Sequence, residues 1–163
     1  MLKKRITTLK QVRRYLDSVP SINWGGCGFA AYAMYLWLEK NGQLSEDTTV
    51  IYGCSSWYFN VHEQNMNALN NGYKNATACI HAALMHEGKI IDSDETINIS
   101  EDHRFSELLV IPRERIHHFM QASLRSEEWA EAFNREVYIP KIEEKLGIRF
   151  FEQTNLKTNE ITG

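Results

Sequence analysis

The order of apolar and polar residues predicts a helix near the start of the chain. In the stretch "TTLKQVRRYLDS", residues 7–18, apolar side chains recur at helical spacing: Leu9, Val12, Tyr15 and Leu16. This spacing places them on one side of an amphipathic helix. Because proline disfavours helical backbone in the residue before it, we expect Pro20 to end this helix.

A second helix is predicted over residues 27–41, in the sequence "CGFAAYAMYLWLEKN". We expect one apolar face on this helix, made by Ala30, Met34, Trp37 and Leu38. Asn41 and Gly42 follow, and this pair is typical of the end of a helix.

The middle of the chain favours strands. Residues 49–54 and 57–61 lie in the β-branched and aromatic segment "TTVIYGCSSWYFN". The later segment "TACIHAALMHEGKIIDSDE" reads as two strands joined by a turn at residues 86–89. A loop of two or four residues in this hairpin places Asp94 directly opposite His81.

The last third of the chain is predicted to be helical. Pro112 stands at a first-turn position, Ser126 is a candidate N-cap, and Pro140 should kink or break the final helix. The order helix, helix, strands, helices is typical of an α+β fold. We expect one domain over residues 1–163, with a core at about 20–111 and a helical C-terminal extension over 112–163.

Composition narrows the class of protein. The chain is 43% hydrophobic and 24% charged, with a formal net charge of -3, so a general affinity for nucleic acid is disfavoured. The basic N-terminus lacks the apolar stretch of a signal peptide, and no apolar run is long enough to cross a membrane. The chain has three cysteines, and this small, odd number argues against a disulfide framework. We therefore expect a reduced, cytoplasmic protein.

One cysteine stands in a setting that favours reactivity. Cys27 lies among glycines at the start of the second predicted helix, where free backbone N–H groups and the helix dipole stabilise negative charge. The same groups favour the ionised form of the thiol and could hold the oxyanion that forms when a thiolate attacks a carbonyl. Cys27 is therefore a candidate nucleophile. The alternative is a small residue that simply packs there.

A thiol nucleophile needs a base, and His81 is the best candidate among the six histidines. It lies inside the apolar strand "ACIHAALM", where a polar ring needs a partner. Side chains alternate along strands, so Asp92 and Asp94 share a sheet face with His81, and either carboxylate can orient the ring. The alternative is a core histidine that a neighbouring carboxylate satisfies.

The segments "NWGGCGFAAYAMYLWLEKNG" and "CIHAALMHEGKIIDSDE" resemble the catalytic core of papain-like cysteine hydrolases, in particular their compact NlpC-type and transglutaminase-like branches. The resemblance covers residues 23–95. It implies a papain-like fold in which a central helix carries Cys27 as the nucleophile, packed on a small antiparallel sheet, with His81 as the base. An NlpC-type alignment selects Asp92 as the third residue, and a transglutaminase-like alignment selects Asp94.

The chain departs from the papain pattern before the nucleophile. Where papain-like enzymes place a glutamine that helps to form the oxyanion hole, this chain has Ser21. Asn23 or the indole N–H of Trp24 could substitute, and Gly26 would contribute to the same oxyanion and substrate-binding region.

The sequence therefore predicts a cysteine hydrolase or acyltransferase without a cofactor, most closely a thiol peptidase or amidase. Its substrate would be a peptide, a protein or a small amide, with no nucleic acid or membrane partner. Two other readings remain open. One is a zinc site in which Cys79 and His81 join Cys27 or Cys54. The other is an inactive papain-like domain that binds a ligand through its aromatic residues.

Overall fold

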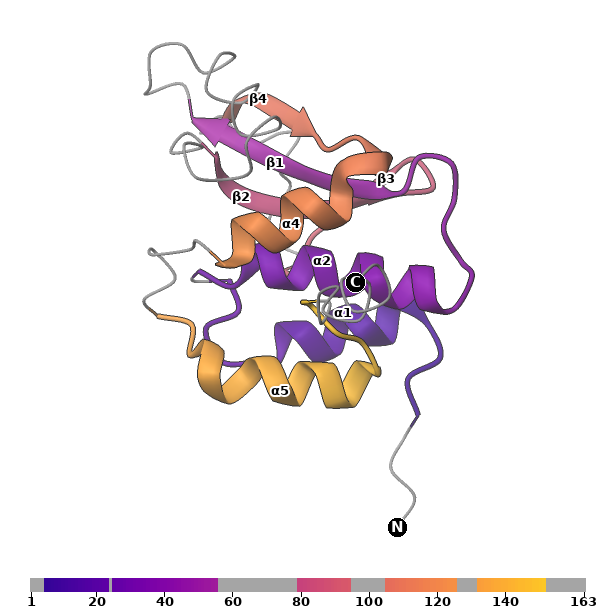
Figure 1. The fold of residues 1–163 in the computed structure, drawn as a ribbon, viewed down its shortest axis with the longest axis vertical. Coiled ribbons are helices and arrows are strands. Elements are labelled where there is room, and N and C mark those ends of the chain that lie inside the picture. Colours follow the sequence, from indigo (N-terminus) through magenta and orange to yellow (C-terminus); the bar gives the residue numbers. More distant parts are fainter. Residues whose placement is uncertain (1–4, 24, 56–78, 95–104, 126–131, 152–163) are drawn as a thin grey trace, which may run out of the picture.

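The computed structural model describes residues 5–23, 25–55, 79–94, 105–125 and 132–151 (Figure 1). Within these ranges the chain forms helices and one small antiparallel sheet, which confirms the α+β class. The helices are α1 (Leu9–Asp17), α2 (Cys27–Lys40), η2 (Arg113–Arg115), α4 (Ile116–Arg125) and α5 (Arg135–Leu146). The strands are β1 (Thr49–Ser55), β2 (Cys79–His86), β3 (Lys89–Ile91) and β4 (Phe105–Val110).

The four strands lie in the order β3-β2-β1-β4, and each neighbouring pair is antiparallel. The hairpin β2–β3 has the predicted two-residue turn, since Met85 pairs with Ile90 and His86 with Lys89. Strand β4 was not predicted. It forms the edge of the sheet beside β1, about fifty residues away in sequence. The predicted strand at 57–61 lies outside the described residues.

The β2–β3 turn uses a left-handed backbone at both central residues, with φ of 50° at Glu87 and 74° at Gly88. Glycine adopts this conformation easily, whereas glutamate does not. The carboxylate of Asp47 accepts hydrogen bonds from both backbone N–H groups, at 2.9 and 2.7 Å. Hydrogen bonds from the Ser45 hydroxyl and from this turn lower the pKa of Asp47 to about 2. The turn is therefore held from outside the hairpin.

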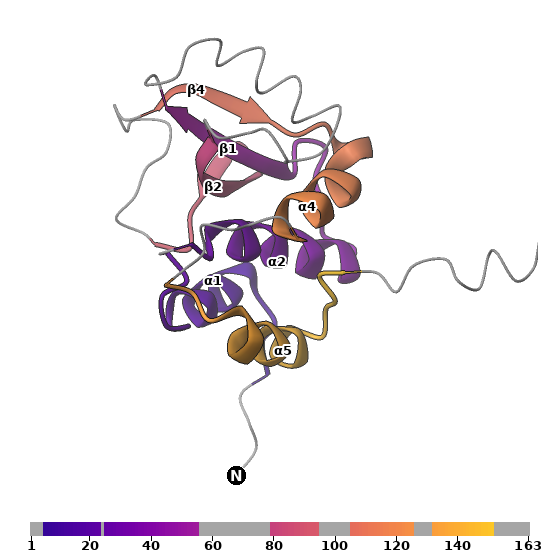
Figure 2. The same cartoon turned by 60° about the vertical axis from the view of Figure 1, so that its left-hand side comes forward.

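Helix α2 is the centre of the molecule. It lies between the sheet on one side and the helices α1 and α5 on the other, with α4 on the same side of the sheet as α2 (Figures 1 and 2). The prediction of a single apolar face is wrong, because the helix is buried on all sides from its first residue as far as Tyr35, and again at Trp37 and Leu38. A helix surrounded by other elements needs no polar face.

The outer helices follow the sequence signals closely. Helix α1 begins with a capping box between Thr8 and Gln11, and its apolar side enters the core. It ends at Asp17, three residues before Pro20. In α5 the N-cap is Asn134. The helix continues through Pro140 as far as Leu146, so the predicted break at this proline does not occur. The candidate N-cap Ser126 lies outside the described residues.

The C-terminal helices share the core of the rest of the chain. Phe119 and Met120 of α4, Ile142 of α5 and Phe150 beyond it are buried in the same apolar cluster as α2. None of the helices in the described ranges combines the length and the apolar character needed to cross a bilayer.

Candidate active site

Cys27 is the first residue of α2, as predicted. The first hydrogen bond of the helix runs from the Ala30 N–H to the Gly26 carbonyl, at 2.9 Å. The N–H groups of the preceding residues in the first turn have no acceptor within the helix, and Gly26 has no side chain that could cap them. The thiol therefore stands at the positive end of the helix dipole, beside amide donors that have no acceptor within the helix.

Gly26 allows this helix start because the chain passes very close to it. A Cβ atom at Gly26 would lie 2.7 Å from the carbonyl oxygen of Ile22 and 3.0 Å from its Cδ1. Real Cβ atoms do not approach other atoms so closely, so the backbone would have to move. The glycine before the nucleophile is thus explained by close packing of the loop that precedes α2.

The structure brings His81 to both of its predicted partners. Its Nε2 forms a hydrogen bond with Oδ2 of Asp92. The Cys27 thiol lies near enough to the ring to contribute to the raised pKa of His81. The β1 residue paired with His81 is Gly53, so no side chain from that position crowds the ring.

The surroundings of His81 favour its protonated form. Burial alone would lower the pKa of His81, but the hydrogen bonds and negative charges of Asp92 and Cys27 outweigh it. Together they raise the pKa of His81 from its ordinary value of 6.5 to about 10. An imidazolium beside a thiol is the environment that stabilises a thiolate.

The two candidate carboxylates have different places. Asp92 is 5% exposed and directed at His81, whereas Asp94 is half-buried and donates its backbone N–H to Oδ1 of Asp92, at 3.1 Å. Regular pairing between β2 and β3 stops at Ile91, so the chain bends before the position at which Asp94 would face His81. This bend brings the nearer aspartate to the ring.

A polar brace that the sequence did not reveal holds the segment after β3. The Ser93 hydroxyl donates to Oδ1 of Asn23, and the Asn23 amide donates to Asp17 at 3.4 Å. The buried guanidinium of Arg13 donates to the Ser93 carbonyl, also at 3.4 Å. The residue next to Asp92 is thus tied both to α1 and to the loop before Cys27.

One signal in the sequence could have revealed part of this brace. Arg13 follows Leu9 by four positions, so it lies on the apolar side of an otherwise amphipathic helix, where a charged residue needs a buried partner. Ser93 has no comparable signal.

The residues suggested for the oxyanion hole are not assembled around the thiol by their side chains. The Asn23 amide is engaged with Asp17 and Ser93, as described above. Trp24 lies outside the described residues. Gly26 contributes the N-cap of α2. The first-turn N–H groups of the helix are therefore the oxyanion donors that the described geometry offers.

The thiol is more enclosed than the sequence suggested. The glycines around Cys27 predict that the first turn of α2 lies exposed at a cleft, but Cys27 is only 6% exposed, so this prediction is wrong. The enclosure keeps water away from the contacts among Cys27, His81 and Asp92, and charged groups interact more strongly there than in water.

The other described histidines have different partners. Nδ1 of His86 faces the Thr48 hydroxyl at 2.7 Å, next to the β2–β3 turn. His117 lies between the Tyr32 hydroxyl and Glu39, and His118 is exposed on α4. His62 and His103 lie outside the described residues.

No group of three or more histidine, cysteine and acidic side chains is arranged to hold a metal within the ranges that the structure describes. Cys54 and Cys79 are paired across β1 and β2, but their side chains are not among those described. The described residues therefore provide no set of ligands for the zinc site suggested by the sequence.

Comparison of the chain with protein-family models, with curated proteins and with solved structures finds no match in any of the three.

Proposed function

We propose that this protein is a cysteine hydrolase or acyltransferase that acts on an amide or thioester carbonyl. In this proposal Cys27 is the nucleophile, His81 is the general acid and base, and Asp92 orients His81. One observation carries the proposal: the buried His81 ring forms a hydrogen bond with the Asp92 carboxylate and lies near the thiol at the start of α2, which contributes to the raised pKa of the ring. Nucleophile, base and orienting group are the parts that covalent catalysis requires.

The first half of the reaction uses the contact between the thiol and His81. The Cys27 sulfur, as a thiolate, attacks the carbonyl carbon, and a C–S bond forms while the carbonyl oxygen becomes an oxyanion. The N–H groups of the first turn of α2, which have no acceptor within the helix, hold this charge in the proposed mechanism. The intermediate collapses, the C–N or C–S bond to the leaving group breaks, and His81 gives its proton to that group.

The second half restores the enzyme. His81 takes a proton from water, the resulting hydroxide attacks the acyl carbon, and the bond to the Cys27 sulfur breaks with release of the acid. An amine in place of water gives acyl transfer by the same steps. Asp92 keeps the Nε2–H of His81 in place, as the carboxylate does in other catalytic triads.

The order of the elements supports a papain-like arrangement as part of this proposal. A central helix begins with the cysteine, a later strand carries the histidine, and the aspartate follows the next strand. In this assignment Asp94 is a positioning residue, because its backbone N–H holds Oδ1 of Asp92. We propose a peptide, a protein or a small amide as the substrate.

The test is site-resolved labelling with iodoacetamide, a small electrophile suited to an enclosed thiol. Mass spectrometry should find Cys27 modified before Cys54 and Cys79, and His81→Ala should slow the modification of Cys27. A panel of fluorogenic peptides, simple amides and thioesters then identifies the class of substrate. Slow labelling of Cys27 that is indifferent to His81, together with no turnover across the panel, would contradict the proposal and leave a binding domain.

A further inference from the structure

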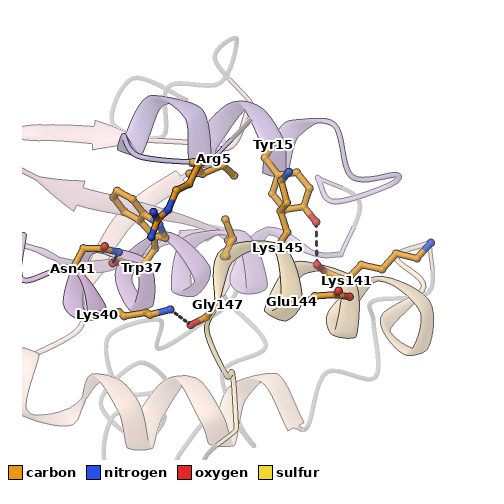
Figure 3. Close-up of a pocket in the computed structure, with 11 residues that line it drawn as sticks. Arg5, Tyr15, Trp37, Lys40, Asn41, Lys141, Glu144, Lys145 and Gly147 are labelled. Carbon is orange, nitrogen blue, oxygen red and sulfur yellow. Dashed lines mark hydrogen bonds between the residues drawn. The ribbon is translucent and has the colours of Figure 1, made fainter. Parts of the chain in front are cut away.

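A second candidate site lies at the opposite end of α2 from Cys27. There a cavity of about 660 Å³ opens between the segment before α1, the end of α2 and the second half of α5 (Figure 3). Since α2 has 14 residues, its two ends are about 20 Å apart. The cavity is therefore separate from the proposed reaction centre, and its chemistry is different.

The wall of this cavity is strongly cationic. Arg5, Lys40, Lys141 and Lys145 line it, against the single carboxylate of Glu144. This is notable in a chain whose formal net charge is -3. Like charges repel one another, so a fold that gathers four cations around one cavity gains from an anion that fills it.

Two of these cations also have a structural reason to be there. Lys40 and Lys145 stand in the last turns of α2 and α5, where helix dipoles favour positive charge. Lys40 donates from Nζ to the Gly147 carbonyl at 2.7 Å, which caps the end of α5. Each helix end contributes about half a negative charge, so about two positive charges remain after both ends and Glu144 are counted.

The cations differ in their ability to reach a ligand. Lys141 extends away from the other labelled cations in Figure 3, so it acts at longer range. Nζ of Lys145 lies 6.0 Å from the centre of the Tyr15 ring, on the cavity wall. Within the part of the chain that the structure describes, no hydrogen bond or ion pair engages the Arg5 guanidinium. Arg5 and Lys145 are therefore the residues best placed to contact an anion.

The size and the remaining walls indicate an organic ligand. Cavities of about 300–1,000 Å³ are typical of small-molecule sites. Ile6, Tyr15 and Leu146 add apolar surface beside the cations. A phosphate group concentrates charge and several acceptor oxygens at one point, and arginine binds it with two parallel hydrogen bonds. We propose that this cavity binds a small organic phosphate that carries at least two negative charges.

The proposal goes beyond the cysteine chemistry and does not depend on it. Its test is isothermal titration calorimetry of the full chain at low salt, with ATP, tripolyphosphate and adenosine as probes. We expect ATP to bind more tightly than tripolyphosphate, because only ATP also uses the apolar walls, and adenosine to give no measurable binding. Affinity for ATP should fall as the salt concentration rises.

Variants locate the binding. Arg5→Gln and Lys145→Gln should each weaken ATP binding about tenfold, the effect expected when a charged hydrogen bond is lost. Lys89→Gln is the matched control, since Lys89 is an exposed lysine on β3 in the sheet, and it should leave the affinity unchanged. Thermal unfolding checks that each variant is folded. No detectable ATP binding, equal affinities for ATP and tripolyphosphate, or equal weakening by Lys89→Gln would each overturn the proposal.

Discussion

Two histidines in this molecule have the same kind of neighbours and very different surroundings. His81 lies between the Cys27 thiol and Asp92, and His117 lies between the Tyr32 hydroxyl and Glu39, at 2.7 and 2.8 Å. In each case a row of contacts joins a thiol or hydroxyl group, an imidazole ring and a carboxylate. Connectivity alone therefore does not distinguish them.

Burial separates the two groups. The side chains of His81 and Asp92 are 11% and 3% exposed, whereas those of His117 and Glu39 are 38% and 39% exposed. Water screens the second pair, and exposed pairs of that kind contribute little to stability. The first pair has little contact with water, so each charge strongly influences the others.

The terminal groups also differ. The Tyr32 hydroxyl lies 2.7 Å from Nδ1 of His117, and the Tyr32 ring packs against Tyr35 and His117. Cys27 stands at a helix start whose first amide donors have no acceptor within the helix. In the proposed function, a row of contacts of this kind forms a reaction centre when its carboxylate is shielded from water and its proton donor stands beside groups that can hold a new charge.

The largest expected difference is between the two proton donors. Cys27→Ala should abolish turnover of whichever substrate the panel identifies, because the nucleophile is gone. Tyr32→Phe should leave turnover within about twofold and lower the free energy of unfolding by about 1 kcal/mol, the usual effect of losing one hydrogen bond. Steady-state kinetics and urea unfolding measure both. Residual turnover in Cys27→Ala would place the chemistry elsewhere.

The two rings give the next largest contrast. His81→Ala should reduce kcat at least about a hundredfold, the lower range for loss of a general base. His117→Ala should change kcat little, since its ring is tied to α2 on the side away from Cys27. The same pair of variants can be compared by the rate at which iodoacetamide modifies Cys27. Equal losses in both variants would indicate a general effect on packing.

Variants of the two aspartates test which of them is the third residue of the proposed catalytic triad. Asp92→Asn should lower kcat at least about tenfold without unfolding the protein, because the amide cannot stabilise the protonated ring as a carboxylate does. Asp94→Asn keeps the backbone N–H that holds Asp92, so its effect should be much smaller. The reverse ranking would favour the transglutaminase-like alignment.

The smallest effect concerns stability and pH. The pKa of His81 rises on folding from 6.5 to about 10, so protonation of this ring stabilises the fold fully below about pH 6.5 and not at all above about pH 10. The native chain should therefore be more stable than His81→Gln at low pH, and this difference in unfolding free energy should shrink by at least about 1 kcal/mol between about pH 6.5 and about pH 10. Urea unfolding at a series of pH values measures it, with His117→Gln as the control. A difference that stays flat would show that folding does not raise the pKa of His81.

Local sequence patterns predicted the elements that carry the candidate site. Glycines before an apolar run placed the start of α2 at Cys27, and turn residues between two apolar strands gave the β2–β3 pairing. A histidine inside an apolar strand pointed to a buried partner, and the structure supplies one in Asp92. These features depend on residues that are close together in the sequence.

The features that were missed depend on distant contacts. Strand β4 is a six-residue segment, "FSELLV", whose polar residues break an apolar alternation, and its pairing partner β1 is far away in the chain. The position of the Asn23 amide is set by Ser93, seventy residues later. Burial of Cys27 likewise depends on elements that pack around α2, and the sequence around the thiol does not reveal them.

The burial of α2 on all sides has a consequence for how the protein is made. When this helix leaves the ribosome α1 has already been made, while β2, α4 and α5, which cover it in the native fold, have yet to be translated. At about 5–20 residues per second, the wait for α5 lasts roughly 5 to 20 seconds. During that time an apolar, aromatic segment is exposed, so nascent chains should bind a chaperone that recognises such segments.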